Sequence, residues 1–134
     1  MKHFMFLCLA ASLLAACHES IEDRAAREAR EYTQRYCPTP VENNTRTDSV
    51  VFDKATRTYT YYCTFSGMMD NADVIGRFRQ DLHERLVSSI RQSNELRAYK
   101  DAAFIFAYVC HSAKNPQKVI FSDRFLPEEY GSKK

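Results

Sequence analysis

The chain has 134 residues, of which 45% are hydrophobic, 27% are charged and 13% are aromatic. That length indicates one domain, and 8 Tyr with 9 Phe are too many aromatic side chains for a disordered chain. Nineteen Lys and Arg against seventeen Asp and Glu give a formal net charge of +2, so we expect no nucleic-acid partner.

The first 16 residues have the layout of a secretory signal peptide. A basic start, Met1–His3, precedes an uncharged apolar run, Phe4–Ala16. This run is shorter than the roughly 20 residues that a membrane-spanning helix needs, which favours cleavage over a retained span. It ends in Leu14-Ala15-Ala16-Cys17, which resembles the bacterial lipobox.

The lipobox resemblance implies that residues 1–16 are removed and that Cys17 is lipidated. The alternative is an ordinary signal peptide cut after Ala-x-Ala, with Cys17 only its neighbour. Two or more acyl chains are enough for stable anchoring, so we expect residues 17–134 to form a single domain held on a membrane. His18 stands where an Asp would favour the inner membrane. We therefore expect an outer-membrane lipoprotein whose domain lies in the periplasm or at the cell surface.

A helix is predicted from Ser20 to Tyr36. Ser20 with Asp23 three residues later is a capping-box-like start, and Cys37-Pro38 ends the helix because a residue before Pro leaves the α region. Apolar side chains recur at helical spacing among charged ones: Ile21, Ala25, Ala29, Tyr32 and Tyr36. The pattern indicates an amphipathic helix with a narrow apolar stripe.

Two runs rich in β-forming residues follow, Ser49–Phe52 and Arg57–Ser66, and the turn at 53–56 predicts a β-hairpin. In the second run, aromatic and sulfur side chains share one face: Tyr59, Tyr61, Cys63 and Phe65. Threonines and Tyr62 occupy the other face. This alternation is typical of a sheet with one buried face.

The strongest helical pattern in the chain runs from Asn71 to Gln92. Its apolar side chains are three or four residues apart: Ile75, Phe78, Leu82, Leu86 and Ile90. A short turn of helix is expected at 95–100. Ala102–Cys110 then predicts a central strand buried on both sides, and Val119–Phe121 predicts a last strand.

The element order α-β-β-α-β-β predicts an α+β fold. We expect a two-layer sandwich with a four-stranded, mainly antiparallel sheet and both helices on one face. The pattern does not determine the order of the strands.

Three cysteines remain once Cys8 is removed with the signal and Cys17 is acylated, so at most one internal disulfide can form. Cys63 and Cys110 lie on the aromatic faces of two strands and can pair if those strands are neighbours. The alternative is that both stay reduced and buried, as small hydrophobic side chains. Cys37, just after the first helix, could compete for either partner.

Neither a metal nor a cofactor is expected. No C-x₂-C spacing is present, and Cys110 and His111 are adjacent strand residues that point to opposite faces. His83 is expected to face solvent on the second helix. With Gly only at 67, 76 and 131, no phosphate-binding loop is predicted, and no nucleophile motif is present. We therefore expect no enzyme activity.

The segment from Pro38 to Asp48 has many specific polar residues. Together with the Tyr-rich strand that follows, it resembles small, uncharacterised bacterial envelope proteins, many of them lipoproteins, with the pattern P-x-x-V-D-x-x-T-R-L-D. The matching residues are Pro38, Val41, Thr45, Arg46 and Asp48, whereas Glu42 replaces the Asp and Thr47 the Leu. The resemblance implies an envelope location, and it transfers no activity and no binding residue.

Two roles are open for this motif. Thr45 and Asp48 can bond local backbone N–H groups, and Arg46 can clamp a carboxylate or a Tyr ring as a structural link. Alternatively, Arg46 and the face that carries Tyr61 form a pocket for an anionic or peptide ligand. We favour the structural role, because polar residues that enter a sheet usually satisfy backbone groups.

A lipid anchor and a small domain without catalytic motifs favour a non-enzymatic binding or assembly module. Its partner would be another envelope protein, as for a pilotin-like or complex-associated protein. The alternative is an inhibitor of a host or competitor hydrolase, which would need a protruding loop.

Overall fold

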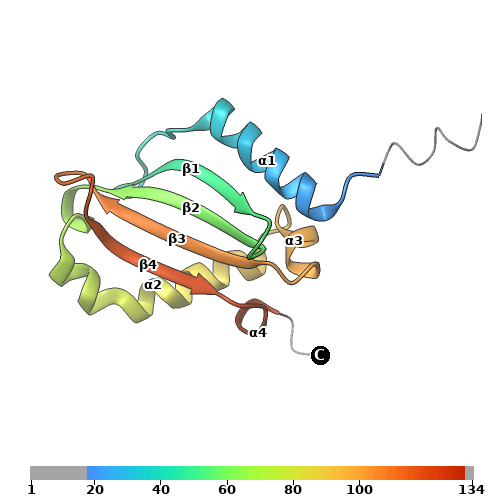
Figure 1. The fold of residues 1–134 in the computed structure, drawn as a ribbon. Coiled ribbons are helices and arrows are strands. Elements are labelled where there is room, and N and C mark those ends of the chain that lie inside the picture. The colour runs from blue at the N-terminus through green and yellow to red at the C-terminus, as the bar shows by residue number, and fades with distance from the viewer. Residues whose placement is uncertain (1–17, 132–134) are drawn as a thin grey trace, which may run out of the picture.

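The computed structural model describes residues 18–131, which form one four-stranded sheet with helices packed against it (Figure 1). The helices are α1 (Ile21–Tyr36), η2 (Gly67–Met69, a 3₁₀ turn), α2 (Ala72–Gln92), α3 (Arg97–Asp101) and α4 (Pro127–Tyr130). The strands are β1 (Thr45–Asp53), β2 (Thr58–Phe65), β3 (Ile105–Ser112) and β4 (Val119–Phe125). The α+β class and the predicted element order are confirmed.

The strands lie side by side in the order β1-β2-β3-β4. The β1–β2 and β3–β4 pairs are antiparallel hairpins, and the central β2–β3 pair is parallel. A parallel pair needs a long crossover connection, which α2 provides. The sheet is therefore mixed, with two of its three pairings antiparallel.

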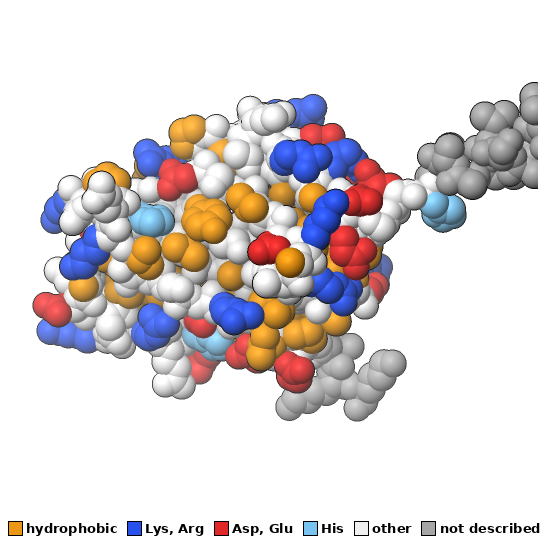
Figure 2. Space-filling view, viewed as in Figure 1, with side chains coloured by type: hydrophobic (Ala, Val, Ile, Leu, Met, Phe, Trp, Pro, Cys, Tyr) orange, Lys and Arg blue, Asp and Glu red, His pale blue; other side chains and the backbone are white. Residues whose placement is uncertain are grey.

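Both long helices pack on the same side of the sheet, the covered face. In Figure 1, α2 passes behind the strands and α1 runs along β1. Among residues 18–131, no helix covers the other side, the exposed face. Hydrophobic side chains gather there over the middle of the sheet, between charged ones at the rim (Figure 2). β3 is central as predicted, but it is not buried on both sides: Ile105 and Val109 point to the exposed face and are only half-buried.

α1 begins and ends where the sequence predicts. The Oγ of Ser20 accepts a hydrogen bond from the N–H of Asp23 at 3.0 Å and caps the first turn. Ala25 and Ala29 are buried against the sheet, which lets the helix approach closely. The same stripe then ends in Tyr32 and Tyr36, which are 39% and 55% exposed. Only the first half of the stripe is therefore covered.

α2 is capped by Asn71, whose Oδ1 accepts from the N–H groups of two first-turn residues. Ile75 and Ile90 are buried, whereas Phe78, which belongs to the same apolar pattern, is 55% exposed. At 100° per residue, Phe78 lies at the edge of the stripe that runs through Ile75, Leu86 and Ile90. No other element of the described part of the chain covers that edge.

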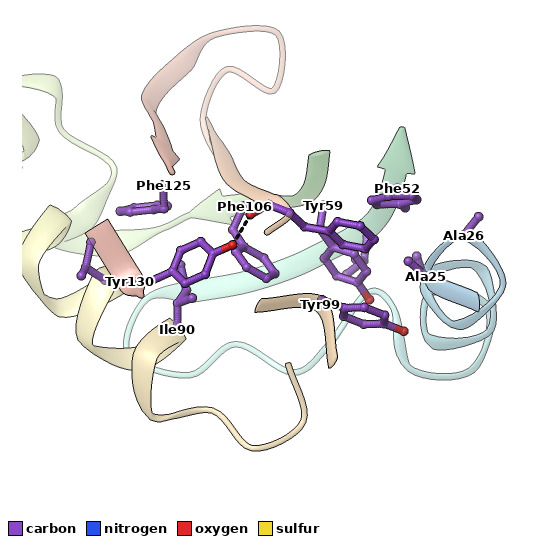
Figure 3. Packing of buried hydrophobic residues seen from close by; sticks show 13 residues of the cluster. Ala25, Ala26, Phe52, Tyr59, Ile90, Tyr99, Phe106, Phe125 and Tyr130 are labelled. Atoms are coloured by element: carbon purple, nitrogen blue, oxygen red, sulfur yellow. Dashed lines mark hydrogen bonds between the residues drawn. The ribbon is translucent and has the colours of Figure 1, made fainter. Parts of the chain in front are cut away.

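The space between sheet and helices has two unequal parts. At the sealed end, α3 and α4 close a cluster of thirteen buried residues (Figure 3): Ala25, Ala26, Ala29, Val50, Phe52, Tyr59, Val87, Ile90, Tyr99, Phe104, Phe106, Phe125 and Tyr130. The hydroxyl of Tyr130 donates to the carbonyl of Phe104 and ties α4 to β3. At the uncovered end, the buried cluster has five residues: Cys63, Phe65, Ile75, Cys110 and Phe121.

β1 begins at Thr45, four residues before the predicted start at Ser49, so Arg46 lies inside a strand and not in a loop. Pairing with β2 is irregular between Thr47 and Ser49, where Asp48 forms a bulge. The prediction missed this stretch because its polar side chains do not show the apolar alternation of a half-buried strand. β4 likewise continues through polar residues to Phe125, past the predicted end at Phe121.

Side chains occupy backbone groups at both outer edges of the sheet. On β1, the Oγ1 of Thr33 donates to the carbonyl of Val50 at 3.0 Å and accepts from its N–H at 2.9 Å. On β4, a guanidinium nitrogen of Arg79 donates to the carbonyl of Ser122 at 2.6 Å. Each edge is thus partly capped by a neighbouring helix.

Candidate functional site

A groove opens on the covered face between α1 and the segment that follows α2. Its volume is about 240 Å³. The lining consists of Glu28 and Tyr32 from α1, Val50, Tyr59 and Tyr61 from the sheet, and Glu95, Leu96 and Tyr99 from the segment after α2. We call this the tyrosine groove, because four of the eight lining residues are tyrosines.

The floor of the tyrosine groove is rigidly packed. Tyr61 stacks on Tyr108 of the neighbouring strand with ring centroids 4.8 Å apart, and Tyr59 stacks on Tyr99 at 5.5 Å. Burial raises the pKa of Tyr59 to about 12 and that of Tyr61 still higher, so both hydroxyls stay protonated. Among residues 18–131, neither hydroxyl makes a hydrogen bond, so both are free to meet a partner.

The rim of the groove carries two carboxylates, of which Glu28 is paired with Arg24 at 2.8 Å and Glu95 is unpaired among residues 18–131. Burial works against the charged form of Glu28, but hydrogen bonds from Tyr99 and Arg24 outweigh it and lower the pKa of that carboxyl. Glu95 stands on the opposite wall and has no ion pair with another described residue. An aromatic floor with carboxylates at its rim fits an apolar segment that carries Lys or Arg.

Apolar side chains remain uncovered beyond the groove. Tyr32 and Tyr36 pack on each other with ring centroids 5.2 Å apart on the last turns of α1. Phe78 is exposed near the start of α2, and Met68, just before it, is 73% exposed. The end of α1 and the start of α2 both lie toward the uncovered end (Figure 1). The two helices thus leave apolar surface free at the same end of the molecule.

The structure brings Cys63 and Cys110 together. They are register partners in the parallel β2–β3 pair, both are buried, and both are thiols. A hydrogen bond between them lowers the pKa of Cys63 and raises that of Cys110. Cys37 is half-buried. Its pKa is raised, mainly by burial and to a smaller extent by the nearby Asp48 and Cys63. Whether Cys63 and Cys110 form a disulfide stays a prediction.

The polar motif forms a compact link on the exposed face. The Nε of Arg46 donates to Asp48 Oδ1 at 2.7 Å, and its Nη2 donates to Thr64 Oγ1 at 3.3 Å. The Thr64 hydroxyl donates in turn to Asp48 Oδ2 at 2.5 Å. The side chain of Arg46 is 41% exposed. This triangle joins β1 to β2 and matches the geometry of a structural clamp.

The other two predicted motif residues lie apart from this link. The hydroxyl of Thr45 donates locally to the carbonyl of Asn43 at 3.3 Å. Tyr61 lies on the covered face, opposite to Arg46, so the two side chains do not line one pocket. The shared Arg46–Tyr61 ligand pocket therefore loses its geometric basis.

His83 does not face solvent freely, contrary to expectation. Its Nδ1 lies 2.7 Å from Asp123 Oδ2, and its Nε2 lies 3.0 Å from Glu129 Oε1. The ring also stacks on Phe125 with centroids 5.0 Å apart. The hydrogen bond to Asp123 is the main reason that the pKa of His83 lies above its usual value. The histidine links α2 to β4 and α4 at the sealed end.

Other predicted features can be placed only within residues 18–131. In that range, no three His, Cys, Asp or Glu side chains gather as metal ligands do. None of the described helices is long and apolar enough to cross a membrane. The signal peptide at 1–16 and the lipidation site Cys17 lie outside the described residues.

The tyrosine groove was not predicted as such, although the side-chain sizes along α1 indicate it. The apolar stripe of α1 changes from alanines, Ala25 and Ala29, to the much larger Tyr32 and Tyr36. Small residues permit close helix–sheet contact, and large ones hold the helix away from the strands. A stripe that changes in this way indicates a helix that diverges from the sheet and leaves a groove beneath it.

Solved structures share this fold at low sequence identity. A secreted protein from Pseudomonas aeruginosa has a TM-score of 0.64 and 10% identity, covering 84% of this chain and 99% of that one. The type 2 secretion system pilotin EpsS from Vibrio vulnificus has a TM-score of 0.62 and 13% identity, covering 84% and 93%. The type II secretion system pilotin AspS from Vibrio cholerae has a TM-score of 0.58 and 10% identity, covering 81% and 90%.

No curated protein matches the sequence. One family model does match, over residues 20–121, from the cap of α1 to the third residue of β4. This range includes the Arg46 motif, the tyrosine groove and the cysteine pair. The chain therefore belongs to the family described as Domain of unknown function (DUF8479).

Proposed function

We propose that this protein is a lipid-anchored, non-enzymatic module that assists assembly in the bacterial envelope. In this role it holds an apolar segment of another envelope protein, flanked by Lys or Arg, in the tyrosine groove. The observation that carries the proposal is the groove itself, with an aromatic floor, free hydroxyls and an acidic rim on a face that the helices only half cover.

The fold supports this assignment. Two of the structures with the same fold are pilotins of type II secretion systems. Those chains are 13% and 10% identical to this one, so the similarity shows a shared fold only. The role in assembly, the partner and the use of the groove are our proposal for this chain.

The anchor is the second part of the proposal. The sequence Leu14-Ala15-Ala16-Cys17 directs removal of residues 1–16 and acylation of Cys17. Three residues separate Cys17 from the first residue of α1. The domain would thus be held close to the membrane, in the outer membrane of the envelope, with its groove available to a partner at that surface.

The hydrolase-inhibitor alternative gains no support from the connections between strands. The turns within the two hairpins, at 54–57 and 113–118, are short. The segment from α1 to β1 is held against the sheet, because the N–H of Thr39 donates to the carbonyl of Thr47 at 2.9 Å. Within residues 18–131, no connection has the length of a protruding inhibitory loop.

Site-specific crosslinking tests the groove. Tyr36 lies beside the groove and packs on Tyr32 of its wall. A photoreactive residue at Tyr36, in the bacterium that carries the protein, should link to an apolar segment with neighbouring Lys or Arg. The same residue at Val51, on the exposed face, is the matched control. Linking of one identical partner peptide from both positions, or from Val51 alone, would refute the groove as the binding site.

A charge reversal on the rim tests the chemistry of the partner. Glu95→Lys should weaken the crosslink from Tyr36, because a basic flank would then meet a cation. Glu84→Lys reverses an exposed charge on α2 outside the groove and should leave the crosslink unchanged. An undiminished crosslink in Glu95→Lys would show that the acidic rim does not select the partner.

Intact mass and fractionation test the anchor separately. The mature protein should begin at Cys17 and carry acyl mass, and Cys17→Ser should release it from membranes or block its processing. A native protein without acyl mass would contradict the anchor and leave the groove experiment standing.

A further inference from the structure

A basic depression lies at the sealed end of the molecule. Its volume is about 440 Å³, and it lies between the end of α2, α3 and α4. Three cations line it, Arg91, Arg97 and Lys100, together with a single carboxylate, Asp101. Among residues 18–131, no carboxylate lies within 4.0 Å of the charged nitrogens of these three cations.

Backbone contacts hold two of these cations at the depression. A guanidinium nitrogen of Arg91 donates to the carbonyl of Glu129 at 2.7 Å, and the Nζ of Lys100 donates to the carbonyl of Arg91 at 2.8 Å. A carbonyl oxygen bears only a partial charge and does not neutralise a cation. The depression therefore keeps a positive charge that its surroundings do not cancel.

Several charges near the start of α1 are cancelled in pairs. Near the start of α1, Asp23 pairs with Lys54, and Glu22 pairs with Arg57 at 3.3 Å. Glu19 pairs with Arg27 at 2.8 Å. With three cations against one carboxylate in its lining, the depression itself keeps an excess of positive charge.

The depression is close to the point where the chain meets its anchor. α3 packs against α1: the Tyr99 hydroxyl donates to Glu28, and Arg24 lies over the Tyr99 ring at 5.9 Å. Figure 1 shows the start of α1, α3 and α4 at one end of the sheet. With three residues between Cys17 and α1, an extended chain spans at most about 14 Å. An acylated Cys17 therefore holds this end near the lipid headgroups.

We infer that the basic depression binds the anionic phosphate headgroups of the membrane in which the protein is anchored. Each Lys or Arg near an anionic membrane surface raises the binding constant for that surface about fivefold. The depression and the acyl chains together give two contacts with the membrane, and two contacts set an orientation. The tyrosine groove then faces a defined direction and does not turn about a flexible tether. This inference rests on the lipid anchor of the proposed function.

The test uses the acylated mature protein in lipid nanodiscs, after intact mass has shown the acyl chains. One disc contains only phosphatidylcholine, and the other contains 30% phosphatidylglycerol, each with a trace of headgroup-spin-labelled lipid. In the anionic discs, paramagnetic broadening should concentrate on the amide signals of residues 91–101. Salt at 1 M, which shortens the Debye length to about 3 Å, should abolish this pattern.

Two matched triple variants separate position from total charge. Arg91→Gln with Arg97→Gln and Lys100→Gln should lose the localised broadening. The control variant combines Arg77→Gln, Lys114→Gln and Lys118→Gln, which remove three unpaired, exposed cations near the uncovered end. This variant should keep the localised broadening.

Three outcomes would overturn the inference: equal broadening in both kinds of disc, an unchanged pattern in the first triple variant, or the same change when inorganic phosphate is added to neutral discs. The last result would indicate a site for free phosphate and not for the membrane. Absence of acyl mass would refute the anchor and the inference together, whereas acylated protein without the localised broadening would refute the inference alone.

Discussion

The two ends of the space between sheet and helices differ in how they are closed. At the sealed end, thirteen buried residues pack under α3 and α4, and Phe104, Phe106 and Phe125 are fully buried. At the uncovered end, five residues form the buried cluster, and Tyr36 and Phe78 remain more than half exposed. One domain thus concentrates its buried contacts at one end and leaves large apolar side chains uncovered at the other.

The largest expected loss of stability comes from removing a buried side chain at the sealed end. Phe106→Ala should lower the free energy of unfolding by about 3–5 kcal/mol, because it removes a fully buried ring and leaves a cavity. Phe78→Ala should change it by about 0.5 kcal/mol or less. Urea unfolding of both variants measures the contrast, and equal losses would show that the two ends do not differ as described.

The cysteine pair offers a way to strengthen the uncovered end. Neighbouring strands lie about 4.8 Å apart, which places register partners such as Cys63 and Cys110 within the Cα range of disulfides. Exchange with oxidised glutathione should join the two sulfurs in a disulfide, and the two thiol hydrogens leave with two molecules of reduced glutathione. The disulfide should raise the free energy of unfolding by about 2–4 kcal/mol.

Peptide mapping and urea unfolding of the oxidised protein check this prediction. Cys37→Ser should form the same disulfide, because Cys37 is not part of the pair. A bond that involves Cys37, or two thiols that stay reduced with a full excess of oxidant, would contradict it.

Arg46 should stabilise the uncovered end more modestly. Arg46→Ala removes the link between Asp48 and Thr64 and should lower the free energy of unfolding by about 1 kcal/mol, since the side chain is partly exposed. Arg46→Lys should restore only part of the loss, because an ammonium group lacks the planar fork. Melting curves without added ligand measure both variants, with Arg77→Ala as the control, and an unshifted Arg46→Ala curve would refute the clamp.

The smallest effect is a pH dependence at the sealed end. The pKa of His83 in the folded protein lies above its usual value of 6.5, chiefly because of the hydrogen bond to Asp123. The protonated His83 side chain therefore stabilises the folded state in full below pH 6.5. This contribution to the free energy of unfolding is lost as the pH rises through the folded-state pKa. Melting temperatures should fall from pH 5.5 to about pH 8.5.

His83→Gln should flatten that decline, because glutamine does not titrate. Glu84→Gln, one residue further along α2, should keep it. A native-like pH dependence in the His83→Gln variant would assign the effect to another group.

Much of the fold could be predicted, because helix caps and apolar stripes are local signals. α1 and α2 end at the predicted residues, and Ser20 and Asn71 cap them as expected. The extent of β1 could not be predicted, because the exposed face of the sheet accepts polar residues such as Arg46 and Thr64. The parallel β2–β3 pairing likewise depends on tertiary packing and leaves no local pattern.

The functional residues were harder to predict than the fold. Sequence reasoning offered a Cys63–Cys110 pair and two reduced, buried thiols as alternatives, and the register brings these two residues together. It could not place Tyr61 and Arg46 on opposite faces, because that depends on the bulge at Asp48. It also treated His83 as exposed, since its partners Asp123 and Glu129 are 40 and 46 residues away.

The hydroxyl of Thr33 has a consequence for the membrane-anchored form that we propose. Tethered copies share a thin layer and meet one another far more often than the same number of molecules in bulk solution. A bare strand edge would let such neighbours join by strand pairing into growing filaments. Thr33 occupies both polar groups of Val50 on one margin of the sheet, and Arg79 occupies the carbonyl of Ser122 on the other. Thr33 and Arg79 thus reduce the backbone groups that the two edges offer to the strands of a neighbouring copy.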